Sequence, residues 1–304
     1  MHTIESSPNS RISTVRSLVR LLRPAQWVKN VFVFAGLLFN RSLGDPAMVT
    51  SVVLAFVGFC LVASAIYVIN DITDREEDRA HATKRTRPIA SGLISVRDAG
   101  WIAGVLLVSG LAIGYAASNG VLLILAIYLA LNVAYSMGLK RVVILDVFII
   151  AAGFLLRILA GTIGVGMAPS EWLFLCSLCL TLFLGFGKRR AELLGRENGL
   201  HKAEGGRSVL RHYSPILLDS MMASVAACTF VTYGLFTMSA HTEQQHGTTA
   251  LVYTLPFVMY AMFRYMYMLH GRGKGDDPSE DLVRDPHILI SGSLWLLVTW
   301  LIMR

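Results

Sequence analysis

Residues 47–78 have the sequence AMVTSVVLAFVGFCLVASAIYVINDITDREED, which joins a long apolar run to a highly charged end. The first 24 of these residues include no charged side chain, whereas six of the last eight are charged. An apolar run of about 20 residues is long enough to cross a bilayer as a helix. The stretch therefore predicts a membrane helix over 47–70 that ends in a carboxylate-rich segment at the membrane boundary.

The rest of the chain repeats this apolar pattern. Of its 304 residues, 54% are hydrophobic and 15% are charged, against roughly 25% charged in soluble domains. We predict an all-α polytopic membrane protein, with an N-terminal arm over 1–24 and a transmembrane domain over 25–304. The domain is expected to contain nine membrane helices, at 25–43, 47–70, 97–117, 120–139, 143–165, 171–188, 216–240, 249–269 and 287–303.

The arm separates its residues by polarity when it is drawn as a helix. Apolar side chains fall on one side and arginines on the other: Ile12, Val15, Val19 and Leu22 against Arg16, Arg20 and Arg23. This pattern favours an amphipathic helix on an anionic membrane surface, so membrane lipids are expected partners. The alternative is a solvated basic tail.

The distribution of Lys and Arg predicts the orientation in the membrane. If the N-terminus is cytoplasmic, 22 of the 27 Lys and Arg residues lie in inner segments or at the helix ends that border them. The outer segments then contain only Arg41 and Arg304. Positive charge is enriched on the cytoplasmic side of membrane proteins. We therefore expect the N-terminus inside, the C-terminus outside and the polar chemistry facing the cytoplasm. The same rule explains the basic loops, so no nucleic-acid partner is expected.

Three carboxylates follow the helix over 47–70 at helical spacing. Asp71, Asp74 and Asp78 fall within about 60° of one another around a helix. Like charges this close repel unless a cation compensates them, and Mg²⁺ is a hard ion that commonly links carboxylates to substrate phosphates. We interpret the stripe, with Asn70 beside it, as a magnesium site. The alternative is a solvated helix end paired with local arginines.

A basic segment follows the carboxylates. Lys84, Arg85 and Arg87 lie within four residues, and the segment closes with Pro88 and Gly92. Such cations suit phosphate oxygens. Ordinary positive charge on the inner face explains their sign equally well, but beside the carboxylates we interpret them as the second half of a magnesium–diphosphate site.

These two motifs carry a family resemblance. The pattern N-D-x-x-D-x-x-x-D at 70–78, followed by K-R-x-R-P-I-A-S-G at 84–92, resembles the first signature of the UbiA-type membrane transferases, which are helical bundles of nine spans. Four further stretches narrow the resemblance to the branch that transfers phosphoribose to decaprenyl phosphate: RPAQWVKN at 23–30, AYSMGLK at 134–140, GKRRAEL at 187–193 and EDLVRD at 280–285.

The resemblance implies a reaction and its partners. The implied enzyme transfers 5-phosphoribose from phosphoribosyl pyrophosphate to a polyprenyl phosphate, with Mg²⁺ and release of pyrophosphate. It would work in the bacterial plasma membrane and supply precursors of cell-envelope polysaccharides. A homo-oligomer is compatible with the resemblance.

The resemblance also suggests roles for individual residues. Asn70, Asp71, Asp74 and Asp78 are expected to bind the metal, and the last three are the candidate catalytic residues. The candidate substrate-binding residues are Lys29, Asn70, Lys84, Arg85, Arg87, Lys188, Arg189, Glu192 and Tyr213. For Lys29, reaching the acceptor phosphate and snorkelling to the interface are equally compatible with the sequence.

One departure separates the chain from aromatic prenyltransferases of the same superfamily. These carry a second Asp-rich motif near the end of the sixth helix, where this chain has Lys188-Arg189-Arg190-Ala191-Glu192. We expect Lys188 and Arg189 to hold substrate phosphates, and Glu192 to orient these two cations or the ribose hydroxyls. The competing hypotheses are an aromatic prenyltransferase that uses a polyprenyl diphosphate, and a transporter or lipid carrier without chemistry.

Three charged residues have no role that the sequence defines. Arg157 lies deep in the fifth predicted span, where a charge is costly and is usually paired or functional. Asp146 lies nearer the cytoplasm, so a direct pair with Arg157 does not follow. Asp219 suits a helix start or packing as well as a substrate contact.

Overall fold

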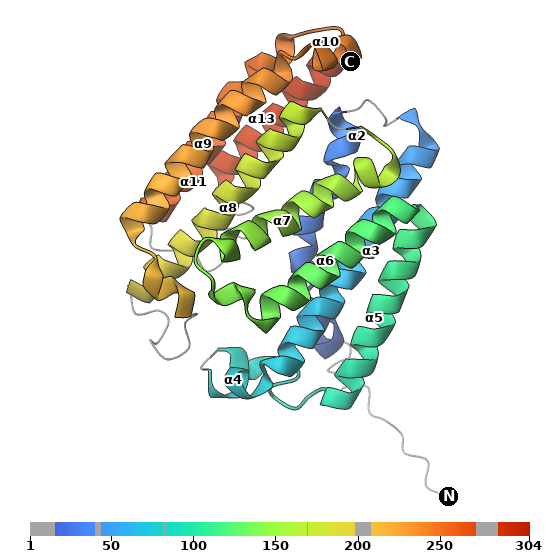
Figure 1. Ribbon diagram of the computed structural model, residues 1–304, viewed down its shortest axis with the longest axis vertical. Coiled ribbons are helices and arrows are strands. Elements are labelled where there is room, and N and C mark those ends of the chain that lie inside the picture. Colours follow the sequence, from blue (N-terminus) through green and yellow to red (C-terminus); the bar gives the residue numbers. More distant parts are fainter. Residues whose placement is uncertain (1–15, 40–43, 82, 169, 198–207, 272–284) are drawn as a thin grey trace, which may run out of the picture.

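The computed structural model describes residues 16–39, 44–81, 83–168, 170–197, 208–271 and 285–304, and these contain helices and no strand (Figure 1). The all-α prediction is therefore confirmed. The helix expected over 47–70 is α3, Pro46–Thr73. It begins where the Asp45 side chain accepts hydrogen bonds from the amides of Ala47 and Met48, which satisfies two otherwise unpaired donors of the first turn.

The other elements follow in a regular order. A helix over 16–22 leads into the 3-10 helix η1, Pro24–Phe34, and α2, Ala35–Phe39. After α3 come α4 (Arg75–Ala80), η3 (Lys84–Thr86), α5 (Val96–Ala117), α6 (Asn119–Met137), η4 (Leu139–Arg141), α7 (Leu145–Ala160) and η5 (Ile163–Val165). The second half contains α8 (Glu171–Glu197), η6 (Ser208–His212), α9 (Pro215–Thr237), α10 (Ala240–His246), η7 (Ala250–Thr254), α11 (Leu255–Gly271) and α13 (Pro286–Met303).

The number of spans differs from the sequence expectation. Seven helices of the described residues are long and apolar enough to cross a membrane, so the count of nine is not confirmed. The other two expected spans, 25–43 and 249–269, each begin as a 3-10 helix and continue as a shorter α-helix. At roughly 2.0 Å per residue for a 3-10 helix and 1.5 Å for an α-helix, η1 and α2 together rise about 30 Å. This is close to the thickness of the hydrocarbon core.

Two hydrophobic cores lie on either side of α7. Figure 1 shows α3, α5 and α6 on one side of α7, and α8, α9, α11 and α13 on the other. One core gathers Phe59, Leu125 and their neighbours, and the other gathers Phe183, Met222 and theirs. Both cores include residues of α7, so this helix joins the two halves of the bundle.

The helix over 16–22 packs on the first half. Leu21 has no exposed surface and lies in a cluster with Val68 of α3 and Ile89 of the segment after η3. The hydroxyl of Ser64 donates to the carbonyl oxygen of Leu22 at 2.8 Å and accepts from the indole of Trp27 at 3.1 Å. The end of the N-terminal arm is therefore anchored to α3, through a leucine outside the apolar side that the sequence pattern defined. Ile12 and Val15 lie outside the described residues.

One ion pair ties α13 to α11. Asp285 accepts two hydrogen bonds from the guanidinium of Arg264, at 2.9 and 3.2 Å, and also caps the first amides of α13. Hydrogen bonding to Arg264 holds the pKa of the Asp285 carboxyl below its usual range. Of the sequence stretch at 280–285, only Asp285 lies within the described residues.

A glycine directly after α7 permits a close backbone contact with η1. A Cβ atom on Gly161 would lie 1.6 Å from the carbonyl oxygen of Val33 in η1, and one on Gly36 would lie 2.1 Å from the carbonyl oxygen of Gly161. These obstacles are backbone atoms, so a rotamer change cannot remove them. Only glycine lets η1 and α2 pack this closely against α7.

Gly161→Ala should therefore destabilise the protein by about 1–3 kcal/mol, as overpacking does elsewhere. The measurement is thermal unfolding in mild detergent. Gly234→Ala in α9 is the matched control, since nothing lies within 4 Å of its Cβ position. Equal unfolding temperatures for the two variants would contradict the close contact.

Candidate functional site

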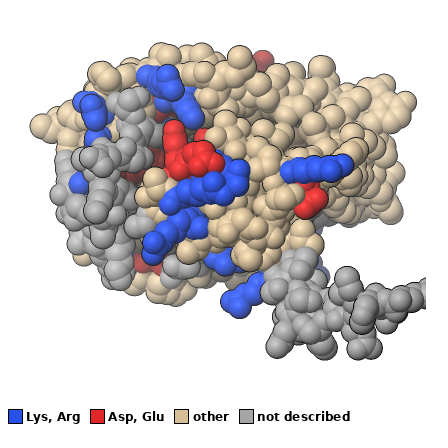
Figure 2. Space-filling model, turned by 90° about the horizontal axis from the view of Figure 1, so that it is seen from below, with Lys and Arg blue, Asp and Glu red and all other residues tan. Residues whose placement is uncertain are grey.

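Charged side chains gather at the end of the bundle where α4 lies. Seen from this end, Lys and Arg side chains surround a compact group of Asp and Glu side chains (Figure 2). The elements that meet here are the end of α3, α4 and the segment that contains η3. This is the region where the sequence placed both the carboxylate stripe and the basic segment.

The structure brings Asp71 and Asp78 together. The chain stays nearly helical from α3 into α4, because the amide of Asp74 donates to the Asn70 carbonyl and the amide of Asp78 donates to the Asp74 carbonyl, each at 2.8 Å. Both carboxylates are buried, at 3% exposure. Each accepts from the same nitrogen, Nη1 of Arg87, at 3.0 Å for Asp71 and 2.6 Å for Asp78. The two carboxylates are therefore close enough to share one cation.

A second arginine reaches Asp71 from the N-terminal arm. Nη2 of Arg23 donates to the same Asp71 oxygen that Arg87 contacts, and its guanidinium lies over the ring of Tyr67, 5.1 Å from the centroid. The sequence pattern had placed Arg23 on the polar side of an amphipathic helix. Arg23 directly precedes Pro24, and a residue before proline disfavours the helical conformation. This was the sequence signal that the helix over 16–22 would end here and that Arg23 would leave the polar side of that helix.

The other candidate residues differ in burial and in their contacts. Asp74 is half-buried, and its side chain has no hydrogen bond or ion pair within the described ranges. Asn70 accepts from the hydroxyl of Ser136 in α6 at 3.2 Å. Lys84 and Arg85 are exposed on η3, which contacts α4. Lys29 is half-buried in η1.

The donor set fits a magnesium ion. In the described part of the chain no three His, Cys, Asp or Glu side chains are arranged as a metal-binding group. Mg²⁺ nevertheless needs only one or two carboxylates when substrate phosphates and water complete its octahedron. Asp71 and Asp78 already converge on one cationic nitrogen, and both supply hard oxygen ligands. Asp74 and the amide oxygen of Asn70 are further oxygen donors next to them in sequence.

A second buried network lies where α7 begins and α8 ends. Arg189 has no exposed surface, and its guanidinium donates to Asp146, to Glu192 and to the hydroxyl of Tyr135. The hydroxyl of Tyr213 donates to the other oxygen of Asp146 at 2.7 Å and accepts from the Ile144 amide at 2.6 Å. Burial raises the pKa of Tyr213, and its hydrogen bond to Asp146 raises it further. Of the two carboxylates that contact Arg189, Asp146 is fully buried, whereas 21% of the Glu192 side chain is exposed.

This network changes the interpretation of the segment over 188–192. We expected Arg189 to hold a substrate phosphate, but all three of its guanidinium nitrogens donate to protein oxygens inside the bundle. Arg190 likewise pairs with Asp219 at 2.9 Å. The two arginines therefore add no uncompensated positive charge here, and Lys188 is the half-buried cation of this segment.

Arg157 lies among neutral oxygens and aromatic rings. Its guanidinium donates to the side-chain oxygen of Asn30, the Gly153 carbonyl and the Tyr128 hydroxyl, and no carboxylate pairs with it in the described ranges. The rings of Phe59 and Phe154 also face it, with centroids at 5.5 and 5.6 Å. These partners are side chains of η1 and α6 and a backbone carbonyl of α7 itself. Arg157 thereby links α7 to η1 and α6.

The sequence comparison decides the family. Residues 30–280 match the UbiA prenyltransferase family, which is most of the chain. The chain belongs to this family.

Two UbiA-family relatives match over nearly their whole length. The decaprenyl-phosphate phosphoribosyltransferase of Corynebacterium glutamicum is 33% identical, over 97% of this chain and 90% of the relative. The protein of the same name from Mycolicibacterium smegmatis is 36% identical, over 93% of this chain and 91% of the relative.

A solved structure confirms the UbiA fold. The UbiA homolog from Archaeoglobus fulgidus, in its structure with GPP and Mg²⁺, superposes with a TM-score of 0.69 over 94% of this chain and 99% of that chain. The sequences are 19% identical, so this likeness establishes the helical architecture.

Asp146→Asn should destabilise this UbiA-family protein strongly, by about 3 kcal/mol or more, because it leaves the guanidinium of Arg189 buried with one carboxylate fewer. Glu76→Gln is the control, since its pair with Arg79 lies at the surface and exposed pairs contribute only about 0–1 kcal/mol. Thermal unfolding in detergent measures both. An equal or larger loss for Glu76→Gln would contradict the assignment of Asp146 as a buried partner of Arg189.

Proposed function

We propose that this protein transfers 5-phosphoribose from phosphoribosyl pyrophosphate to the phosphate of a polyprenyl lipid, with release of pyrophosphate. The observation that carries the proposal is the similarity to decaprenyl-phosphate phosphoribosyltransferases over at least nine-tenths of their length. The charged cluster at the end of α3 supports it, because it combines carboxylates for a metal with cations for phosphates. The product suits the assembly of cell-envelope polysaccharides.

The reaction needs charge stabilisation more than acid–base chemistry. The C1–O bond to pyrophosphate breaks, a new bond forms from C1 to the acceptor phosphate oxygen, and the leaving group departs with its negative charge. The acceptor phosphate is already anionic, so no dedicated general base is required. A bound Mg²⁺ would neutralise the departing diphosphate as a Lewis acid. Catalysis then rests on positioning and preorganised charge.

The chain's residues divide this work between them. Asp71 and Asp78 would hold the metal at the end of α3, with Asp74 and Asn70 as additional oxygen ligands. Lys84 and Arg85 are exposed on η3, which contacts α4, and would bind the departing pyrophosphate. Arg87 keeps the two buried carboxylates together before the metal arrives.

The second network would form the opposite wall of the site. Asp146, Arg189 and Tyr213 lock one another inside the bundle, so in this proposal they position residues and do not contact substrate. Glu192 is held by Arg189 and keeps an exposed edge, which suits a contact with ribose hydroxyls. Lys188 and Lys29 are the half-buried cations proposed for substrate phosphates.

The proposed orientation places this chemistry at the cytoplasm. The basic loops near 71–96 and 189–215 belong to the inner face by the positive-inside rule. In Figure 1 the C-terminus lies at the end of the bundle opposite α4, in agreement with an outer C-terminus. A water-soluble donor and a membrane-embedded acceptor would meet at this boundary.

Label from phosphoribosyl pyrophosphate should enter the lipid fraction when the purified protein is incubated with decaprenyl phosphate and Mg²⁺. Chelation with EDTA should abolish the transfer, because the carboxylates alone cannot stabilise the departing pyrophosphate. The same preparation is also given a prenyl diphosphate and an aromatic acid. Transfer of the prenyl group alone would establish the aromatic prenyltransferase, and no reaction from folded protein with either pair would favour a lipid carrier.

Asp74→Asn should lower the transfer rate by at least roughly 100-fold, as loss of a metal ligand does. Its side chain has no partner within the described residues, so the unfolding temperature should stay unchanged and the loss can be assigned to function. Glu76→Gln is the control on α4, because Glu76 is exposed and pairs with Arg79 at the surface. Full activity of Asp74→Asn would remove Asp74 from the site.

A further inference from the structure

The helix η1 is long for its type. It keeps 3-10 geometry over eleven residues, Pro24–Phe34, whereas runs beyond three or four residues are uncommon in proteins. The register holds at both ends, because the Gln26 amide donates to the Arg23 carbonyl at 2.9 Å and the Ala35 amide donates to the Phe32 carbonyl. With three residues per turn, every third side chain falls on the same side of the helix. Three straight rows of side chains therefore run along η1.

Two of these rows have clear surroundings. The first row packs into the bundle and consists of Trp27, Asn30 and Val33. The indole of Trp27 donates to Ser64 of α3, and the backbone of Val33 lies against Gly161 directly after α7. The second row points outward and consists of Ala25, Val28 and Val31, of which the last two are 43% and 52% exposed. This apolar, exposed row is the one that faces lipid in a membrane-spanning chain.

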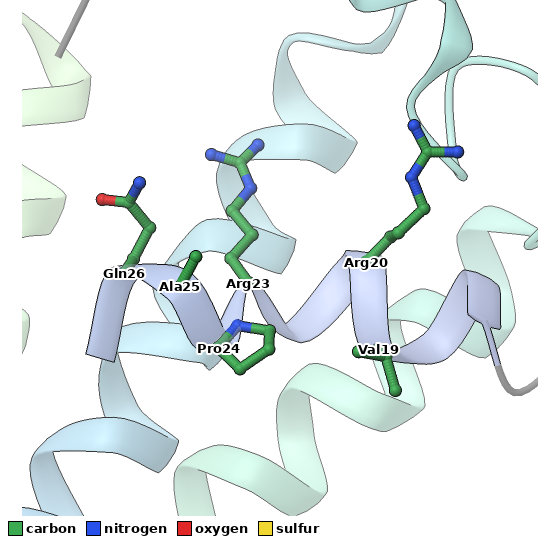
Figure 3. A pocket seen from close by; sticks show the side chains of 6 residues that line it. All are labelled: Val19, Arg20, Arg23, Pro24, Ala25 and Gln26. Atoms are coloured by element: carbon green, nitrogen blue, oxygen red, sulfur yellow. The ribbon is translucent and has the colours of Figure 1, made fainter. Parts of the chain in front are cut away.

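The third row faces the interior between α3 and α7. It consists of Gln26, Lys29 and Phe32, which are all half-buried. In Figure 3 the side chain of Gln26 extends to the same side of the segment as that of Arg23, which contacts Asp71. At the other end of the row, Phe32 packs edge-on against Phe154 of α7, with ring centroids 5.6 Å apart. Lys29 lies between these two contacts, so the row turns it toward the interior and away from lipid.

One buried amide fixes the rotation of η1 about its axis. The side chain of Asn30, which is 1% exposed, accepts from Nε of Arg157 in α7 at 2.6 Å and donates to Sγ of Cys60 in α3 at 3.2 Å. It is therefore held by both helices that flank η1. Neighbouring residues of a 3-10 helix are 120° apart, so fixing Asn30 also fixes the direction of Lys29.

The charge of Arg157 is more than packing alone requires. A charge within a membrane helix is costly and is retained where it is paired or functional. No carboxylate pairs with Arg157 in the part of the chain that the structure describes. The Gly153 carbonyl and the Tyr128 hydroxyl hold the two ends of its guanidinium, and Nε is directed at Asn30. A planar group held at three points is a rigid anchor for a neighbouring amide.

We infer that Arg157 and Asn30 form a clamp that positions Lys29 for the phosphate of the lipid acceptor. Both clamp residues are positioning residues and touch no substrate. An acceptor anchored in the bilayer must reach from lipid into the interior, and η1 borders both, through the outward row and the row of Lys29. The inference rests on the proposed function for the identity of the acceptor, whereas the direction of Lys29 does not depend on it.

The direction of Lys29 can be measured without substrates. Nitroxide labels are attached to Lys29→Cys and, as the matched control, to Val28→Cys, in a protein that also carries Cys179→Ser and Cys228→Ser to remove the accessible native thiols. In vesicles of phosphatidylcholine and phosphatidylglycerol, molecular oxygen collects in the hydrocarbon and a nickel chelate stays in water. Oxygen should relax the label at 28, and the nickel chelate the label at 29. Adding Asn30→Leu should shift the label at 29 toward oxygen.

Transfer kinetics test the clamp itself. Lys29→Gln and Asn30→Leu should each raise the KM for polyprenyl phosphate about tenfold, as loss of one hydrogen bond to a charged group does, and leave the KM for phosphoribosyl pyrophosphate unchanged. The double variant should also show about a tenfold rise, because both changes remove the same contact, whereas independent effects would multiply to about a hundredfold. Val28→Ala on the outward row is the control and should keep the wild-type KM.

Two further variants separate positioning from folding. Asn30→Asp keeps the acceptor for Arg157 and should restore the KM toward the wild-type value. Asn30→Leu leaves the guanidinium with one partner fewer, so its unfolding temperature is measured in detergent. If it does not fold, Asn30→Leu combined with Arg157→Met removes the charge together with its partner and takes its place in the comparison with Lys29→Gln.

Two results would overturn the inference. One is a label at 29 that oxygen relaxes as strongly as the label at 28, and the other is a rise of about a hundredfold in the KM of the Lys29→Gln and Asn30→Leu double variant. If the wild-type protein failed to transfer phosphoribose, the proposed function would fall, while the labels would still decide the direction of Lys29.

Discussion

Charge that leaves water must be compensated within the protein, and the bundle depends on this constraint. An isolated carboxylate or guanidinium inside a low-dielectric interior costs several kcal/mol, so each needs a partner at hydrogen-bond distance. Asp71 and Asp78 are compensated by Arg23 and Arg87, Asp146 by Arg189, and Asp285 by Arg264. Arg157 is the exception, since the neutral oxygens of Asn30, Gly153 and Tyr128 solvate it.

These pairs also connect the helices. Arg87 fixes the segment after η3 against the end of α3, and Arg189 ties the end of α8 to the start of α7. Arg157 adds a link from α7 to η1, close to where Gly161 lets the two backbones meet. The side chains of the two hydrophobic cores hold the helices together through van der Waals packing, and the ion pairs connect particular helix ends. In this bundle the polar groups that suit a diphosphate reaction are the same groups that orient the helices.

The sequence predicted which charged residues belong to the candidate site better than it predicted which residues they pair with. The spacing of Asp71, Asp74 and Asp78 identified the carboxylate segment, because helical periodicity needs no tertiary information. Asp146 was considered beside Arg157 on the same helix, whereas it pairs with Arg189 on the next one. The Asp146–Arg189 pair can form because α7 and α8 run antiparallel, which places the start of α7 beside the end of α8. Arg190 and Asp219 had no local signal, because 29 residues separate them.

The helical membrane class, the UbiA resemblance and the segment that holds the carboxylates could all be predicted from the amino-acid sequence. These depend on the length of apolar runs and on local periodicity, which any membrane-spanning chain must satisfy on its own. Three features became visible in the packed helices: Arg23 reaches Asp71, Arg189 is buried inside the bundle, and the spans expected at 25–43 and 249–269 begin as 3-10 helices. Local sequence could not predict the first two, because compensation of buried charge and close backbone contact are properties of helix pairs. Residues far apart in the chain meet only after the helices have packed.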